Sequence, residues 1–167
     1  LALCLLGAQA RADEAIVVQK AAGQSNPRLY LKAFSGPAAL RERLLNDLHY
    51  TDWFTVTEAA GEADYLAEVT VIERPGANQV SLALSDHLGN PLGTLEQRGD
   101  HSVAHLARSA VDNLILRVFK APGPCHTRLA WVRQEGRHKE IWQADFDGGN
   151  PNRLTHNSSL SVEPAWS

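Results

Sequence analysis

The pattern of apolar and polar positions predicts two regions of different character along the chain. Between residues 29 and 119, strand-like and helix-like segments follow one another, whereas the region after residue 128 contains only short strands and turns. The predicted strands lie at 29–34, 54–57, 65–73, 79–86, 92–97, 129–132 and 140–145. Two other segments, 37–48 and 102–119, repeat apolar residues every three or four positions and are predicted to be helices.

The first region is predicted to form an α+β domain. A turn at 75–78 joins two alternating strands into a hairpin, and the strand at 92–97 extends this hairpin to a meander. The apolar stripe of the 102–119 helix should pack on one face of the sheet. We therefore expect a mixed sheet covered by two helices. The segment 120–124 contains two prolines and a glycine, which cannot continue a helix, so the domain should end there.

The first twelve residues resemble the end of a signal peptide. An apolar run at 1–6 is followed by small residues, and Ala10 and Ala12 have the spacing that signal peptidase requires before its cleavage site. Cleavage after Ala12 would make Asp13 the first mature residue, and cleavage after Ala10 is the alternative. We expect the chain to begin inside this leader, because no initiator methionine precedes it. A short buried helix is the other interpretation, and the bulky leucine before Cys4 disfavours lipidation.

Composition narrows the classes of partner. The chain is 44% hydrophobic, enough for a real core, and its 16 basic and 19 acidic residues give a net charge of −3. Because no segment concentrates lysine or arginine, nucleic acid is disfavoured as a partner. Removal of the leader would leave Cys125 as the one cysteine, so no disulfide within the chain is expected.

The region after residue 128 carries an ordered set of motifs. Trp131 ends the run Leu-Ala-Trp, Trp142 follows an isoleucine in the next strand, and the turn at 145–150 reads Asp-Phe-Asp-Gly-Gly-Asn. Arg-Leu-Thr at 153–155 and Pro-Ala-Trp-Ser at 164–167 complete the set. Indole rings offer large apolar surfaces to neighbouring sheets, and Asp-Gly is a signal for a tight turn. This order of motifs resembles the propeller repeat of the TolB family, in which one blade spans about 40 residues.

The resemblance extends to the order of segments along the whole chain. It implies an α+β N-terminal domain followed by the start of a TolB-type β-propeller. The expected segments are a signal-peptide remnant (1–12), a mobile N-terminal arm (13–27), an α/β TolB N-terminal-like domain (28–121), a linker (122–127) and a truncated first blade (128–167).

The same resemblance implies a function in protein binding, without catalysis and without a cofactor. Proteins of this family are periplasmic components of the Tol–Pal system, which maintains envelope integrity during cell division. Their N-terminal arm binds TolA, which is anchored in the inner membrane, and their propeller binds the outer-membrane lipoprotein Pal. The expected partners are therefore TolA-like and Pal-like proteins, contacted by a monomer that reaches the membranes only through them. The Pal contacts are expected in blades that follow residue 167.

By position, the resemblance implies that only the arm is a partner-binding site within this chain. Its residues are Asp13, Glu14, Ala15, Ile16, Val17, Val18, Gln19, Lys20, Ala21 and Ala22. The three branched residues at 16–18 are the expected apolar anchors. A β-forming arm can dock on its own domain or add a strand to a partner's sheet edge, and such exchange would act as a switch.

Two groups of residues could in principle bind a metal ion, and each has a simpler interpretation. His101 and His105 are four positions apart, but they are expected to face solvent with no third ligand nearby. Asp145, Asp147 and Asn150 lack the further acidic ligands of a calcium loop and are predicted to form a plain turn. No metal ligands are therefore predicted.

Catalytic residues are not predicted either. Cys125 stands next to His126, but adjacent residues of an extended linker point apart, so a free linker thiol is expected. Glu58, Glu62 and Asp64 are expected to form a solvated acidic rim. The chain has no glycine-rich phosphate loop and no nucleophile-elbow motif.

Two alternatives to a Tol–Pal component remain open on the sequence. An exported propeller could gate a downstream serine peptidase, in which case a Gly-x-Ser-x-Gly motif should follow the propeller. An exported propeller could also bind a small ligand or glycan, and neighbouring genes for TolA and Pal would argue against that function. The sequence beyond residue 167 separates the first alternative from a Tol–Pal component.

Overall fold

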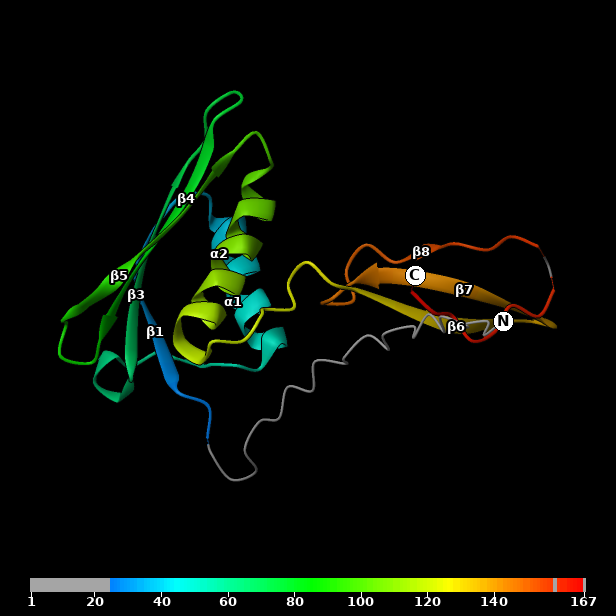
Figure 1. Ribbon diagram of the computed structural model, residues 1–167, viewed down its shortest axis with the longest axis horizontal. Helices are drawn as coiled ribbons and strands as arrows, with labels where there is room; N and C mark the ends of the chain where they lie inside the picture. The colour runs from blue at the N-terminus through cyan, green and yellow to red at the C-terminus, as the bar shows by residue number, and fades with distance from the viewer. Residues whose placement is uncertain (1–24, 158, 167) are drawn as a thin grey trace, which may run out of the picture.

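The computed structural model describes residues 25–157 and 159–166, and for residue 135 it describes the backbone alone. Two β-sheets lie on either side of two helices (Figure 1). The first sheet contains β1 (Arg28–Ser35), β2 (Thr55–Thr57), β3 (Tyr65–Ile72), β4 (Asn78–Asp86) and β5 (Pro91–Gly99). The helices are α1 (Ala38–Thr51) and α2 (Val103–Phe119), and a short 3-10 turn, η1, spans Ala60–Glu62.

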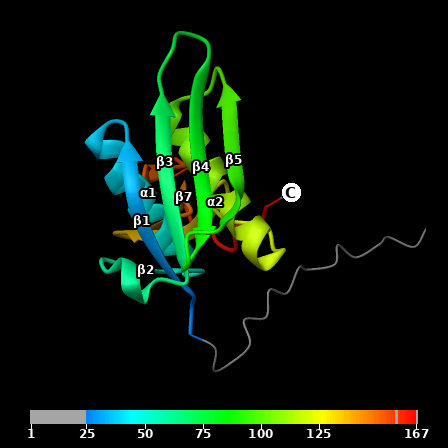
Figure 2. The ribbon, with the colours of Figure 1, turned by 90° about the vertical axis from the view of Figure 1, so that its left-hand side faces the viewer.

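The first sheet is mixed, as the sequence predicts. Its strand order is β2-β1-β3-β4-β5, and Figure 2 shows β1, β3, β4 and β5 side by side. Strand β1 runs parallel to both of its neighbours, whereas β3, β4 and β5 form an antiparallel meander. A bulge between Leu31 and Ala33 shifts the register of β1 against β3.

Helix α1 begins one residue later than the apolar repeat predicts. Pro37 has an extended backbone, with φ −61° and ψ 136°, and caps the helix instead of forming its first residue. The helix then continues to Thr51, beyond the predicted end at residue 48. Its buried face includes Leu40, Leu44 and Leu48, which recur at the four-residue spacing of one helical face.

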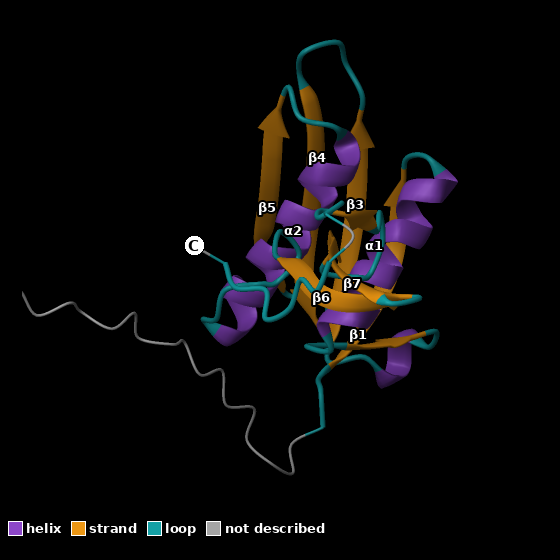
Figure 3. Ribbon diagram, turned by 90° about the vertical axis from the view of Figure 1, so that its right-hand side faces the viewer, coloured by secondary structure: helices purple, strands orange, loops and turns teal. Residues whose placement is uncertain are grey.

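Helix α2 has the stronger amphipathic pattern and forms much of the core. The side chain of Ser102 accepts a hydrogen bond from the amide of His105 and caps the N-terminus, while Lys120 ends the helix in a left-handed conformation. The buried stripe of α2 packs against the first sheet as predicted, and its members are Leu106, Ala107, Ala110, Val111, Leu114 and Ile115. Figure 3 shows both helices covering the same face of this sheet.

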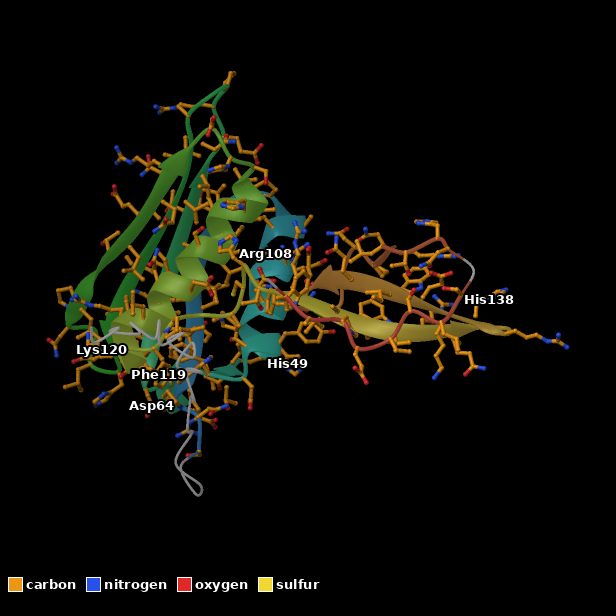
Figure 4. All side chains as sticks on the ribbon, turned by 45° about the vertical axis from the view of Figure 1, so that its right-hand side comes forward. His49, Asp64, Arg108, Phe119, Lys120 and His138 are labelled. Carbon is orange, nitrogen blue, oxygen red and sulfur yellow. The ribbon has the colours of Figure 1, made fainter. Side chains whose placement is uncertain are left out.

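The second sheet is antiparallel and is called the C-terminal sheet below. It contains β6 (Arg128–Glu135), β7 (His138–Asp145) and β8 (Asn152–Arg153) in that order. Its β7–β8 turn lies against the helices, and the β6–β7 turn with His138 points away from them (Figure 4). Among the described residues, no helix combines the length and the apolar character needed to cross a bilayer.

Candidate functional site

The predicted partner-binding residues, 13–22 of the arm, lie outside the described residues. The predicted acidic rim is exposed, and two of its members contact one arginine: Glu62 pairs with Arg28 at 3.4 Å and Asp64 accepts the Arg28 amide at 2.7 Å. The described residues with the densest polar contacts lie instead where the C-terminal sheet meets the two helices.

Arg108 of α2 is the centre of this junction (Figure 4). Its Nη2 lies 3.0 Å from Oδ2 of Asp145 and 3.4 Å from Oδ2 of Asp147, two residues of the β7–β8 turn. Its guanidinium also lies over the ring of Phe146, 5.5 Å from the centroid. Burial disfavours the charged form of Asp145, but hydrogen bonds from Asn150 and Arg108 outweigh it and lower the pKa of this carboxyl.

Helix α1 adds a second arginine and a buried carboxyl to the junction. Nη2 of Arg43 lies 3.3 Å from Oδ2 of Asp147, and its Nε lies 3.5 Å from Oδ1 of Asp47. Asp47 is 0% exposed. Burial, and then repulsion by Asp147, Asp112 and Asp145, raise the pKa of Asp47 to about 7.

The connecting segment is fixed to α2, which corrects the prediction of an extended linker. Cys125 is 1% exposed and belongs to the hydrophobic core. Its amide donates a 2.9 Å hydrogen bond to Oδ1 of Asp112 on α2, which holds the segment in place. Burial, followed by the hydrogen bond to Asp112, raises the pKa of the Cys125 thiol, so the thiolate needed for reactivity is suppressed. Gly123 passes so close to α2 that a Cβ there would lie 2.0 Å from Oδ1 of Asp112.

A third histidine, His126, lies beside the pair at the start of α2, which the sequence interpretation missed. The ring centroid of His105 lies 4.4 Å from that of His101 and 4.4 Å from that of His126. Nε2 of His126 is 2.9 Å from the hydroxyl of Ser109, which fixes one nitrogen of this group of tilted rings. Desolvation, His126 and His101 together lower the pKa of His105.

These groups do not form a metal centre within the described part of the chain. There, no group of three or more histidine, cysteine, aspartate or glutamate side chains is arranged to hold a metal ion. The 145–150 segment forms a turn as predicted, with Gly148 at φ +77° and Asn150 donating to Asp145 at 2.9 Å. Its two carboxylates contact arginines, which the sequence motif alone does not indicate.

The predicted tryptophans shape the C-terminal sheet. Trp131 and Trp142 face each other across β6 and β7, and their rings stack with centroids 6.4 Å apart. Arg133 covers the ring of Trp142 at 4.8 Å, and Trp166 is 61% exposed. The other large apolar side chains exposed on this part of the chain are Leu129, Leu154, Leu160 and Val162.

A buried glutamate explains the Arg-Leu-Thr motif. Glu140 of β7 is 0% exposed, and its Oε1 lies 2.8 Å from Nη2 of Arg153. Its Oε2 accepts the hydroxyl hydrogen bond of Thr155, whose oxygen also accepts the amide of Ile141 at 2.9 Å. The motif therefore anchors the chain after β8 to the middle of β7. Sequence reasoning missed Glu140, because its burial depends on these distant partners.

Comparison with known proteins gives consistent sequence matches. No family model matches the chain. It is 46% identical over 46 residues to the Tol-Pal system protein TolB of Desulfosudis oleivorans, a match covering 28% of this chain and 10% of that protein. It is 26% identical over 149 residues to TolB of Bordetella pertussis, covering 77% of this chain and 34% of that protein. A TolB homologue of Chlamydia muridarum is also 26% identical, over 141 residues, 77% of this chain and 31% of the homologue.

The fold is also similar to that of a solved TolB structure. The crystal structure of TolB from Acinetobacter baumannii superposes with a TM-score of 0.66 at 17% identity, covering 81% of this chain and 39% of that one. The chain thus spans about a third or less of the curated relatives described above. By sequence and by fold, the chain is therefore similar to a part of TolB.

Proposed function

We propose that this protein acts in the periplasm as the TolB component of a Tol–Pal system and works by binding proteins rather than by catalysis. The observation that carries the proposal is the 149-residue match to a Tol-Pal system protein, which covers 77% of the chain. On this proposal the partners are a TolA-like protein of the inner membrane and the lipoprotein Pal of the outer membrane. Linking them would support envelope integrity during cell division.

The C-terminal sheet fits the role of a first propeller blade. Propeller blades pack face to face, so each presents apolar side chains to its neighbour. Leu129 and Leu154 are exposed on this part of the chain, and Trp131 and Trp142 are only half-buried. Further blades packed on this sheet would cover such side chains. We therefore propose that β6, β7 and β8 form the inner part of the first blade of a β-propeller.

The N-terminal arm is the proposed binding site for the TolA-like partner. The segment 13–22 contains Ile16, Val17 and Val18, three β-branched residues suited to strand addition on a sheet edge. We also propose that the arm spans residues 13–27 and that the domain after it spans residues 28–121. Docking and release of such an arm would let one segment serve two surfaces.

Deletion of residues 13–19 tests this proposal. The deletion should abolish binding to TolA in titration calorimetry while circular dichroism stays unchanged. Replacing all three of Ile16, Val17 and Val18 with serine should weaken binding in the same way, because the apolar anchors are lost. Asp100→Asn, an exposed substitution outside the arm, is the control and should bind like the wild type. Unchanged affinity after the deletion would reject the arm as the TolA site.

A further inference from the structure

Asp47 is a buried carboxyl that no described neighbour satisfies. It lies on α1, 0% exposed, and neither of its oxygens accepts a hydrogen bond from the described residues. The nearest cation is the Arg43 guanidinium, with Nε 3.5 Å from Oδ1 but without hydrogen-bond alignment. A buried carboxylate without hydrogen bonds is costly in its charged form, so this site favours the protonated acid.

Titratable groups from every element of the junction act on Asp47. Helix α1 contributes Arg43, helix α2 contributes Asp112, the connecting segment contributes the neutral thiol of Cys125, and the β7–β8 turn contributes Asp145 and Asp147, which also pair with Arg108 of α2. Both arginines are already engaged by the turn carboxylates. The ionised form of Asp47 would therefore add a further negative charge to a junction that already has more carboxylates than guanidinium groups.

The C-terminal sheet supplies two of the three carboxylates that repel Asp47. Asp145 and Asp147 reach α1 and α2 only when the sheet is docked, since both belong to its turn. Their repulsion acts against the ionised form of Asp47 in the docked arrangement and is relieved when the sheet separates from the helices.

We propose that docking of the C-terminal sheet onto α1 and α2 is coupled to the uptake of one proton by Asp47, so that acidification strengthens docking. By linkage, whatever changes the docked population also changes the proton occupancy of this carboxyl. The junction is thus a pH-responsive contact between the two parts of the chain.

The direction of the pH effect follows from the two states of Asp47. Its pKa is about 7 in the docked structure, mainly through burial, against an ordinary value of 3.8. Separation removes the repulsion by Asp145 and Asp147, so the pKa of Asp47 is lower in the separated form. Between the two pKa values the docked form holds a proton that the separated form releases. Docking is therefore strongest near the lower value and weakens as pH rises toward 7, with little further change above it.

Hydrogen exchange at the amide of Cys125 measures this coupling. Cys125 lies in the connecting segment, three residues before β6, and its amide donates to Asp112 of α2. Separation of the sheet should therefore expose this amide. After correction for intrinsic exchange, its protection should fall by up to about tenfold per pH unit between pH 5 and pH 7 in the wild type. Asp47→Asn should show little pH dependence, and the exposed control Asp100→Asn should behave like the wild type.

Two results would overturn the proposal. Protection that stays constant with pH in the wild type, or that keeps its pH dependence in Asp47→Asn, would exclude Asp47 as the coupled group. If Asp47→Asn fails to fold, carbon-detected NMR titration of the Asp47 carboxyl in the unmodified protein gives the answer. A midpoint at or above pH 5 supports the coupling, and a midpoint below 5 rejects it.

Discussion

At the scale of single residues, the burial of some side chains follows from the local sequence pattern, whereas the burial of others depends on partners far along the chain. Leu44 and Leu48 are buried where the helical repeat predicts, because the apolar side of a short helix is fixed by neighbours in sequence. Glu140 is equally buried, yet it stands in a polar stretch, and its partners Arg153 and Thr155 come 13 and 15 residues later. Its burial could not be predicted from its surroundings in the sequence.

Replacing Glu140 with glutamine should destabilise the C-terminal sheet. The substitution keeps the shape of the side chain but removes the buried charge that pairs with Arg153, which costs about 3 kcal/mol. Urea unfolding followed by tryptophan fluorescence measures the loss. Glu96→Gln is the matched control, because its pair with Arg98 is exposed and should contribute about 0–1 kcal/mol. Equal losses in the two variants would contradict the structural role of Glu140.

Gly123→Ala should also be destabilising, for a purely steric reason. A Cβ at this position would lie 2.0 Å from Oδ1 and 2.5 Å from Cα of Asp112, so the connecting segment would have to move away from α2. Overpacking of this kind costs about 1–3 kcal/mol, which thermal unfolding detects as a lower midpoint. Gly61→Ala is the control, since nothing lies within 4 Å of its added methyl group. A Gly123→Ala midpoint equal to that of the control would show that the segment yields freely.

At the scale of elements, the period of the apolar pattern predicted most helices and strands, but not how the strands pair. The hairpin of β3 and β4 and the helix α2 follow from alternation and from the three- and four-residue repeat. The place of β1 between β2 and β3 does not, because Leu29 pairs with both Val56 and Tyr65, far along the chain. Pairing over such separations depends on how α1 packs against the sheet, which no local pattern contains.

The turn between β4 and β5 should be sensitive to acid. Oδ1 of Asp86 accepts the amides of Leu88 and Asn90, and its Oδ2 accepts the Asn90 side chain at 2.8 Å. The hydrogen bond from the Asn90 side chain is the main cause of the lowered pKa of this carboxyl. The stabilisation is therefore complete above the ordinary value of 3.8 and is lost as pH falls through the lower folded value.

Asp86→Ala and Asp86→Asn together test this turn. The alanine variant should lower the thermal midpoint at pH 6, because two backbone amides lose their acceptor. The asparagine variant keeps an oxygen acceptor and should lose less. The difference in midpoint between wild type and Asp86→Ala should shrink as pH is lowered through the range 4 to 2. A difference that is constant over this range would show that the charge of Asp86 has no part in the turn.

At the scale of the whole molecule, the contact between the two parts of the chain rests on complementary charge as well as apolar packing. Arg43 and Arg108 lie on different helices, and both converge on the β7–β8 turn. The sequence motif identifies this turn but is silent about the arginines, which come 104 and 37 residues before the carboxylates that they bind. A junction between separately patterned regions carries no periodic signal, so it could not be predicted.

Arg108→Ala should separate the unfolding of the C-terminal sheet from that of the helices. The variant removes contacts to Asp145, Asp147 and the Phe146 ring from a side chain that is 14% exposed, at a cost of about 3 kcal/mol. Three of the four tryptophans lie after residue 128, so fluorescence mainly reports the C-terminal sheet, whereas circular dichroism reports the helices. The two signals should then give different midpoints of unfolding. The exposed Arg98→Ala is the control. Coincident transitions at the wild-type midpoint would show that the junction does not need Arg108.

The parallel placement of β1 also has a consequence for the order of folding. In the β3–β4 hairpin Ile72 pairs with Gln79, so the loop between the two strands is short and closes rapidly. Strand β5 then pairs with β4 after another short turn. Strand β1 is synthesised before them, but it pairs with β3 only after α1, β2 and η1 have been laid down. Loop-closure entropy therefore favours a nucleus in the meander, with β1 inserted late. A strand that leaves the ribosome before the meander is thus among the last to find its partners.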